Sequence, residues 1–164
     1  MRQSSTKPRA GKRHFDSLEQ EAFLNLWRTY DRLHVVEEEL FARFDLTPQQ
    51  YNALRLLRGE HPGRLTTLGL AGQLVSRAPD ITRIIDKLVE RGLVVRERPS
   101  GDRRTVLVGI SREGVKLLTR LDAEVRACHE QQLGHLSQAE LKKLIALLQA
   151  ARLPHEDEQS AWQK

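Results

Sequence analysis

The sequence has few of the features of secreted or membrane proteins. Its 164 residues include one cysteine, Cys128, so no internal disulfide can form and we expect a reducing, cytoplasmic location. Runs of about 18 apolar residues are absent, so no segment is predicted to span a membrane. The basic N-terminus has no apolar stretch behind it, which argues against a secretory signal.

Recognisable catalytic motifs are absent as well. There is no P-loop and no G-x-S-x-G pattern, and Cys128 does not belong to a local cysteine–histidine signature. His34 and Glu38 share a helical face at spacing i, i+4, which supplies at most half of a metal site, and a solvated pair is the commoner arrangement. We therefore predict that the chain is not an enzyme and holds no metal or cofactor.

The net charge of +5 comes from the N-terminus. Residues 1–14 hold five basic residues and no acidic one, which leaves 22 basic and 22 acidic residues in the rest of the chain. We interpret residues 1–14 as a disordered basic arm, either a phosphate-tracking tail or a solvated terminus. Between residues 77 and 104, eight basic residues accompany five acidic ones, so local positive charge is concentrated there.

The stretch 79–91 predicts an amphipathic helix. Its apolar residues recur at helical spacing, Pro79 suits the first turn, and Gly92 suits the C-terminal stop. A short helix over 67–75, with Leu68, Ala71 and Leu74 facing inward, precedes it and is separated from it by the tight turn 76–78. The predicted buried face of the longer helix is Ile81, Ile84, Ile85 and Leu88, and the polar face is Asp80, Thr82, Arg83, Asp86 and Lys87.

Two short strands are predicted after Gly92. They cover 93–98 and the alternating positions Val106, Val108 and Ile110, and a basic tip over 99–104 joins them. A short helix, a tight turn, a second helix and a basic hairpin form a winged helix-turn-helix. The predicted fold is therefore mainly α with a small β-hairpin wing.

The flanking segments predict long helices with more apolar surface than this unit can cover. They span 17–44 before it and 112–153 after it, where Ser111 and Ser137 suit the caps of two successive helices. Thr47–Gln50 forms a further capping box, and Leu65 is a possible edge strand.

The excess apolar surface favours a two-fold homodimer over the alternative, a monomeric elongated bundle. We predict one domain over 15–153, in which 46–111 is the winged helix-turn-helix and 17–44 and 112–153 are dimerisation helices. Residues 154–164 are predicted to form a flexible tail.

The order and spacing of motifs over 46–114 resemble the MarR family of bacterial transcription regulators. This resemblance implies that the terminal helices form the dimer and that an effector pocket lies between them and the winged helix. The matching residues are Leu70-Ala71, Ile81-Thr82-Arg83, Lys87-Leu88, Gly92-Leu93-Val94, Asp102-Arg103-Arg104, Ile110-Ser111 and Gly114. Candidates for the pocket are Trp27, Tyr30, His34 and Tyr51, although aromatics at helical spacing are more often plain core.

A DNA-reading helix presents polar side chains near its N-terminal end, which enters the major groove. Asp80 could accept a hydrogen bond from a cytosine, but stabilising the helix N-terminus is the favoured interpretation. We expect Arg91 to contact a phosphate or nothing. The candidates on and before this helix are Ser76, Arg77, Asp80, Thr82, Arg83 and Lys87.

At the wing tip, Arg104 matches the basic position of the family's Asp-x-Arg motif, and Asp102 would support it. We expect Arg104 to enter the minor groove and Arg103 to contact a phosphate. Cys128 falls within the apolar seam of a predicted helix, which indicates a buried structural thiol, with a peroxide-sensing thiol as the alternative.

We predict a dimeric, sequence-specific transcription regulator, a repressor, that binds a palindromic operator in double-stranded DNA and responds to a small molecule or to oxidation. The alternative is a winged-helix module that binds protein and does not bind DNA sequence-specifically.

Overall fold

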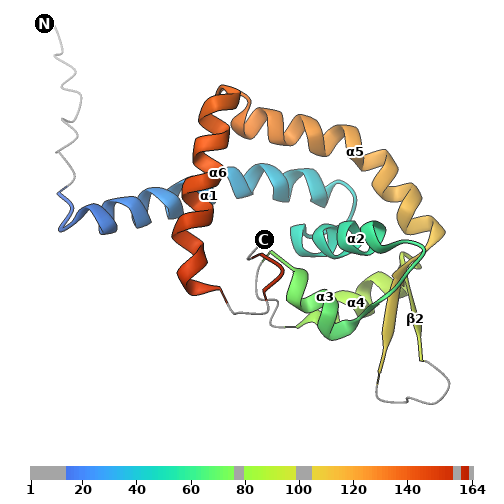
Figure 1. The fold of residues 1–164 in the computed structure, drawn as a ribbon. Helices are drawn as coiled ribbons and strands as arrows, with labels where there is room; N and C mark the ends of the chain where they lie inside the picture. The colour runs from blue at the N-terminus through green and yellow to red at the C-terminus, as the bar shows by residue number, and fades with distance from the viewer. Residues whose placement is uncertain (1–13, 76–79, 99–104, 157–159, 163–164) are drawn as a thin grey trace, which may run out of the picture. The chain divides into compact units, whose positions relative to one another are not determined.

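The computed structural model describes residues 14–75, 80–98, 105–156 and 160–162, and it divides into two units, residues 1–34 and 35–164. The predicted fold class is confirmed, because the described elements are mainly helices together with a small antiparallel sheet (Figure 1). The described residues form the helices α1 (Leu18–Ala42), α2 (Pro48–Glu60), α3 (Thr67–Gln73), α4 (Ile81–Glu90), α5 (Arg112–Leu133) and α6 (Gln138–Arg152), the strands β1 (Leu65–Thr66), β2 (Val94–Glu97) and β3 (Leu107–Ile110), and the 3-10 turn η1 (Leu153–His155).

The second unit is built on a three-stranded antiparallel sheet in the order β1-β3-β2. Leu65 of β1 pairs with Val108 of β3, and Val94 of β2 pairs with Ile110, so the predicted edge strand at Leu65 is confirmed. Figure 1 shows α3 and α4 beside α2, with β2 at the same end of the molecule's second unit. The largest fully buried side chains of this core are Leu54, Leu57, Leu70, Ile85, Leu88, Val108, Leu118 and Leu121.

The predicted helix starts are confirmed by their hydrogen bonds. The amide of Gln50 donates to the Thr47 hydroxyl at 3.2 Å, and the Thr47 amide donates to the Gln50 side chain at 2.9 Å. Ser137 and Glu140 form the same reciprocal box at α6, and the hydrogen bonds from Ser137 lower the pKa of Glu140. Ser111 caps α5 by accepting from the Gly114 amide at 3.0 Å.

Two helices end in the same hydrogen-bonded motif, a Schellman turn with a left-handed residue. At the end of α4, Gly92 has φ +68°, and the Leu93 amide donates to the Leu88 carbonyl at 2.9 Å. At the end of α1, Asp45 has φ 52°, and the Leu46 amide donates to the Phe41 carbonyl at 3.0 Å. The first turn confirms Gly92 as the predicted stop, whereas the second places an aspartate where glycine is usual.

The inward face predicted for the short helix was partly wrong. Leu68 is 83% exposed, whereas Leu70 is fully buried and Leu74 is buried. The helix α3 spans Thr67–Gln73, and Leu74 is its C-cap. Its buried side is marked by Leu70 and Leu74, which are four residues apart. Leu68 then lies roughly 160° around the helix from Leu70 and faces outward.

The terminal helices bury little of their apolar surface within the chain. In α1, Leu40 and Phe41 are the buried residues, and α6 has none among its described residues. The seam predicted in α5 is confirmed, because Leu118, Leu121, Val125 and Cys128 are all buried. The large exposed apolar side chains of α1 and α6 are Leu18, Phe23, Leu24, Leu26, Trp27, Tyr30, Val35, Ile145, Leu147 and Leu148.

The C-terminal segment makes contacts where we expected an unstructured tail. Leu153–His155 continue α6 as a 3-10 turn, and Ser160 donates from its hydroxyl to Glu156 at 2.6 Å. Arg152 pairs with Glu156 and lies over the Trp162 ring at 5.4 Å from its centre. Among the described helices, none is long and apolar enough to cross a membrane.

Candidate nucleic-acid interface

The exposed face of α4 carries the polar side chains that the sequence predicted for reading DNA. Thr82, Arg83 and Lys87 are exposed, while Ile85 and Leu88 are fully buried beneath them. Thr82 and Arg83 fall in the first turn of the helix, which is the end that enters a major groove in helix-turn-helix proteins. The first turn of α4 therefore exposes a hydroxyl and a guanidinium.

Asp80 caps α4 at its N-terminus. Its Oδ1 accepts from the Arg83 amide at 2.9 Å, which is the hydrogen bond of an N-cap. The favoured interpretation of Asp80 as a helix-stabilising residue is therefore confirmed, and a contact with a base stays a prediction. The remaining predicted DNA-binding residues, Ser76, Arg77, Arg103 and Arg104, lie outside the described residues, as do Asp102, the predicted support of the wing, and Pro79.

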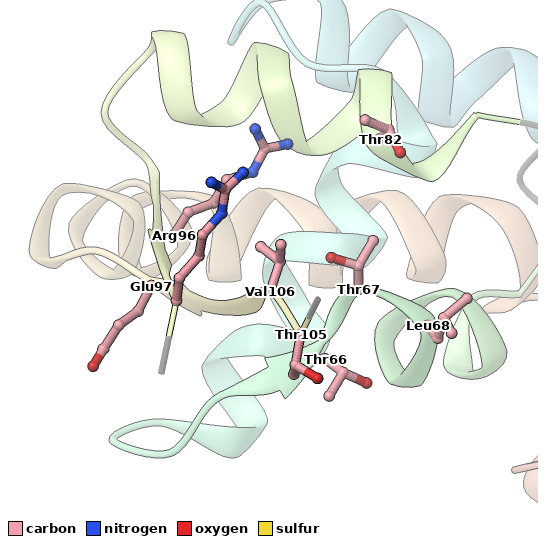
Figure 2. Close-up of a pocket in the computed structure, with 9 residues that line it drawn as sticks. Thr66, Thr67, Leu68, Thr82, Arg96, Glu97, Thr105 and Val106 are labelled. Carbon is pink, nitrogen blue, oxygen red and sulfur yellow. The ribbon is translucent and has the colours of Figure 1, made fainter. Parts of the chain in front are cut away.

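A cleft of about 740 Å³ opens between the start of α4 and the base of the wing. We call it the wing cleft. Figure 2 shows the Arg96 guanidinium reaching toward α4, while the Glu97 carboxylate points to the opposite side of β2. This alternation follows from the pleat of a strand, in which successive side chains take opposite faces. The lining residues are Thr66, Thr67, Leu68, Thr82, Arg96, Glu97, Arg98, Thr105 and Val106.

Ion pairs compensate the acidic groups around the wing cleft. Arg96 of β2 forms an ion pair with Asp86 of α4, which connects the strand to that helix. Glu97 forms an ion pair with Arg64. Arg98 forms no ion pair with any residue of the described part of the chain. The Arg98 guanidinium is among the groups that line the cleft, and a guanidinium is suited to an anion such as a DNA phosphate.

The sequence prediction did not include Arg96, Arg98 or the threonines at positions 66, 67 and 105. The signal was present in β2, because Arg96 and Arg98 alternate with Glu97 and so occupy one face of the strand. Which face meets α4 depends on how the sheet packs, and the sequence pattern alone does not give it.

The expectation for Arg91 was partly wrong. Its Nη2 donates to the Phe44 carbonyl at 3.1 Å and its Nη1 donates to the Asp45 carbonyl, both at the end of α1. The guanidinium is therefore engaged by two main-chain carbonyl groups of the protein, and a phosphate contact stays a prediction.

The residues predicted to line an effector pocket are described within their own units. In the first, Tyr30 stacks on His34 with ring centres 4.9 Å apart, and Trp27, which is 62% exposed, borders a hollow of about 390 Å³. In the second, Tyr51 stacks on Phe41 at 4.4 Å, and burial raises the pKa of its phenol. The pocket itself stays a prediction.

Cys128 is buried in α5, as predicted, with 6% of its surface exposed. Burial, and secondarily the charge of Glu37, raise the pKa of the Cys128 thiol. The thiolate is the form that reacts with peroxide, so a raised pKa works against peroxide sensing. Within the described residues, no group of three or more metal-ligating side chains comes together.

The short α3, the amphipathic α4 and the antiparallel strands β2 and β3 define a winged-helix DNA-binding protein. A family model described as MarR family matches residues 46–106. The HTH-type transcriptional regulator FarR of Neisseria gonorrhoeae is 36% identical over 107 residues, which cover 63% of this chain and 72% of that protein. The chain belongs to the MarR family of transcriptional regulators.

Solved structures agree with this assignment. A MarR transcription factor from Planctomyces limnophilus is 54% identical, with a TM-score of 0.66 over 84% of this chain and 99% of that one. A MarR family regulator from Streptomyces coelicolor, solved in complex with DNA, shares the fold at a TM-score of 0.78 and 16% identity, over 93% and 97% of the two chains. The relatives are regulators of transcription, so DNA binding is favoured over the protein-binding alternative.

Replacing Asp80 separates its capping role from a role in base recognition. Asp80→Ala should lower the free energy of unfolding by about 1 kcal/mol, because the Arg83 amide loses its acceptor. Asp80→Ser keeps a capping oxygen and should keep that stability, while DNA affinity rises because a carboxylate near phosphates is removed. Thermal melting and duplex titration measure both effects. A relaxed preference at one cytosine in Asp80→Ser would show instead that Asp80 reads a base.

Cys128→Ser tests whether the thiol only packs. The substitution should lower the free energy of unfolding by about 1–3 kcal/mol, because a hydroxyl replaces sulfur in an apolar site. DNA binding should be unaffected by peroxide in the parent and in the variant, since the raised pKa keeps the group as a thiol. The measurement is a duplex titration before and after peroxide treatment. Release of DNA by the treated parent alone would contradict this expectation.

Proposed function

We propose that the chain is a cytoplasmic homodimeric repressor that binds a palindromic operator in double-stranded DNA and is released from it by a small molecule. The exposed polar face of α4, set beside the wing cleft, is the observation that carries this proposal. A dimer held across a promoter prevents polymerase from occupying the same DNA, which is the physical basis of repression.

The dimer is supported by apolar surface that the single chain leaves in water. Phe23, Trp27 and Tyr30 of α1 are each 60% exposed or more, and Ile145 and Leu147 of α6 are more than half exposed. Soluble monomers rarely leave such large side chains grouped on their surface, and a second copy offers the same surface in return.

The proposed DNA contacts divide between three places. Thr82, Arg83 and Lys87 meet the major groove, and Arg104 at the wing tip enters the minor groove, where the potential is most negative. Between them, the wing cleft directs Arg98 toward the backbone, so that a phosphate contact fixes the register in which α4 approaches the bases.

The residues of the first unit proposed to contact the effector are Trp27, Tyr30 and His34. These residues combine aromatic surface with polar groups, the composition expected of a small-molecule site. The stacked pair Tyr30 and His34 and the exposed Trp27 ring support this choice. An oxidative signal acting at Cys128 is disfavoured by the raised pKa of its thiol.

Light scattering tests the assembly. At micromolar concentration the protein should have about twice the 18.8 kDa mass of the chain, because α1 and α6 need apolar partners. Trp27→Glu with Ile145→Glu should shift the mass toward that of one chain, while Arg55→Glu on α2 should not. A mass of one chain for the parent would remove the basis for a palindromic operator.

Arg104 and Arg83 should differ in how they depend on the DNA sequence. Arg104→Ala should cost about 1–3 kcal/mol of binding on operators with A·T-rich flanks, and G·C flanks, which widen the minor groove, should erase most of that difference. Arg83→Ala should weaken binding whatever the flank. Titrations at fixed salt on both duplexes make the comparison. If Arg104→Ala binds both flanks as tightly as the parent, the wing makes no groove contact.

A further inference from the structure

Arg91 makes contacts that the proposed DNA-binding role does not use. It is the cap residue at the end of α4, and its side chain reaches the end of α1. One nitrogen donates to the Phe44 carbonyl at 3.1 Å and another donates to the Asp45 carbonyl. A single guanidinium therefore joins the DNA-reading helix to the C-terminus of α1.

The two carbonyls are well suited to a cation. They belong to the turn that ends α1, where the Asp45 amide donates back to the Ala42 carbonyl at 3.1 Å and the Leu46 amide to the Phe41 carbonyl. The C-terminal end of a helix carries partial negative charge in its last carbonyl groups, and a guanidinium there is stabilising. Arg91 thus caps a helix other than its own.

The same end of α4 is also joined to α5. The hydroxyl of Ser111 donates to the Gly92 carbonyl at 2.6 Å, and the Ser111 amide donates to the Leu93 carbonyl at 3.0 Å. Because Ser111 is the N-cap of α5, the end of α4 is connected to both α1 and α5. Both helices belong to the segments for which dimerisation is proposed.

We infer that Arg91 is a positioning residue that holds α4 at a fixed angle to the dimer helices and thereby sets the spacing between operator half-sites. The inference rests on the proposed dimeric DNA binding. In a two-fold dimer, the separation and rotation of the two reading helices must match those of the half-sites. One added base pair rotates one half-site relative to the other by about 35°. Binding affinity falls strongly only if the two copies of α4 are held rigidly and cannot follow that rotation.

The experiment uses the full chain and a palindromic duplex selected with it from a random-sequence library. Versions of that duplex with one base pair added or removed at the centre report the spacing preference. The parent should lose about tenfold or more in affinity when the spacing changes, the scale of losing correct contacts in one half-site. Arg91→Ala should lose less than about threefold, because α4 can then turn relative to α1.

Matched variants isolate the main-chain contact. Asp45→Gly removes the carboxylate but keeps the carbonyl that Arg91 uses, and glycine accepts the φ of 52°, so the spacing preference of the parent should remain. Arg91→Lys keeps the charge but loses the two-pronged geometry, and its preference should fall between those of the parent and Arg91→Ala. Arg55→Ala removes an exposed cation from α2 and should behave as the parent does.

Three results would overturn the inference. An unchanged spacing preference in Arg91→Ala, with a lower melting temperature, would make Arg91 structural only. A salt dependence of binding reduced by about 1.8 in slope, about 0.9 for each of the two protomers, would show that Arg91 contacts a phosphate. If the parent selects no duplex, the proposed DNA binding fails and this inference fails with it, a result that is distinct from the first two because it concerns the parent alone.

Discussion

The amphipathic division of α4 is the constraint on which the winged-helix unit depends. Ile85 and Leu88 are fully buried, and burying each contributes roughly 1.5–3 kcal/mol, so α4 has one stable rotation about its own axis. That rotation exposes Thr82 and Arg83. The helix α2 and strand β2 pack against α4, and the pair between Asp86 and Arg96 joins the strand to it on the exposed side. The face offered to DNA is therefore fixed by what the opposite face must bury.

The features that the sequence predicted correctly are local ones. The capping boxes at Thr47 and Ser137 could be recognised because the partners lie within three residues of each other. The stop at Gly92 is equally local, since the left-handed backbone there favours glycine. The buried stripe of α4 has a helical period that ten residues display clearly, whereas α3 has seven, too few to show which of Leu68 and Leu70 faces inward.

The features that the sequence did not predict depend on tertiary packing. Arg91 donates hydrogen bonds to Asp45 and Phe44, which precede it by 46 and 47 positions in the chain. No sequence pattern near Arg91 indicates that the end of α1 lies within reach of its side chain. Arg98 was missed for a similar reason, because its place in the wing cleft depends on the packing of β2 beside α4. The sequence shows that both residues are cations. The groups near them in the fold come from segments distant in the chain, which the sequence pattern does not reveal.

The distribution of ion pairs explains how a chain with a nearly neutral body presents positive charge to DNA. Three acids near the interface are already engaged: Asp80 caps α4, Asp86 pairs with Arg96, and Glu97 pairs with Arg64 on the other side of β2. Glu90 lies at the far end of α4 from Thr82. The cations Arg83, Lys87 and Arg98 are exposed and add positive charge to the surface between α4 and the base of the wing. Because such a charge attracts phosphates of any sequence, the proposed recognition of a particular operator would depend on contacts between α4 and base edges.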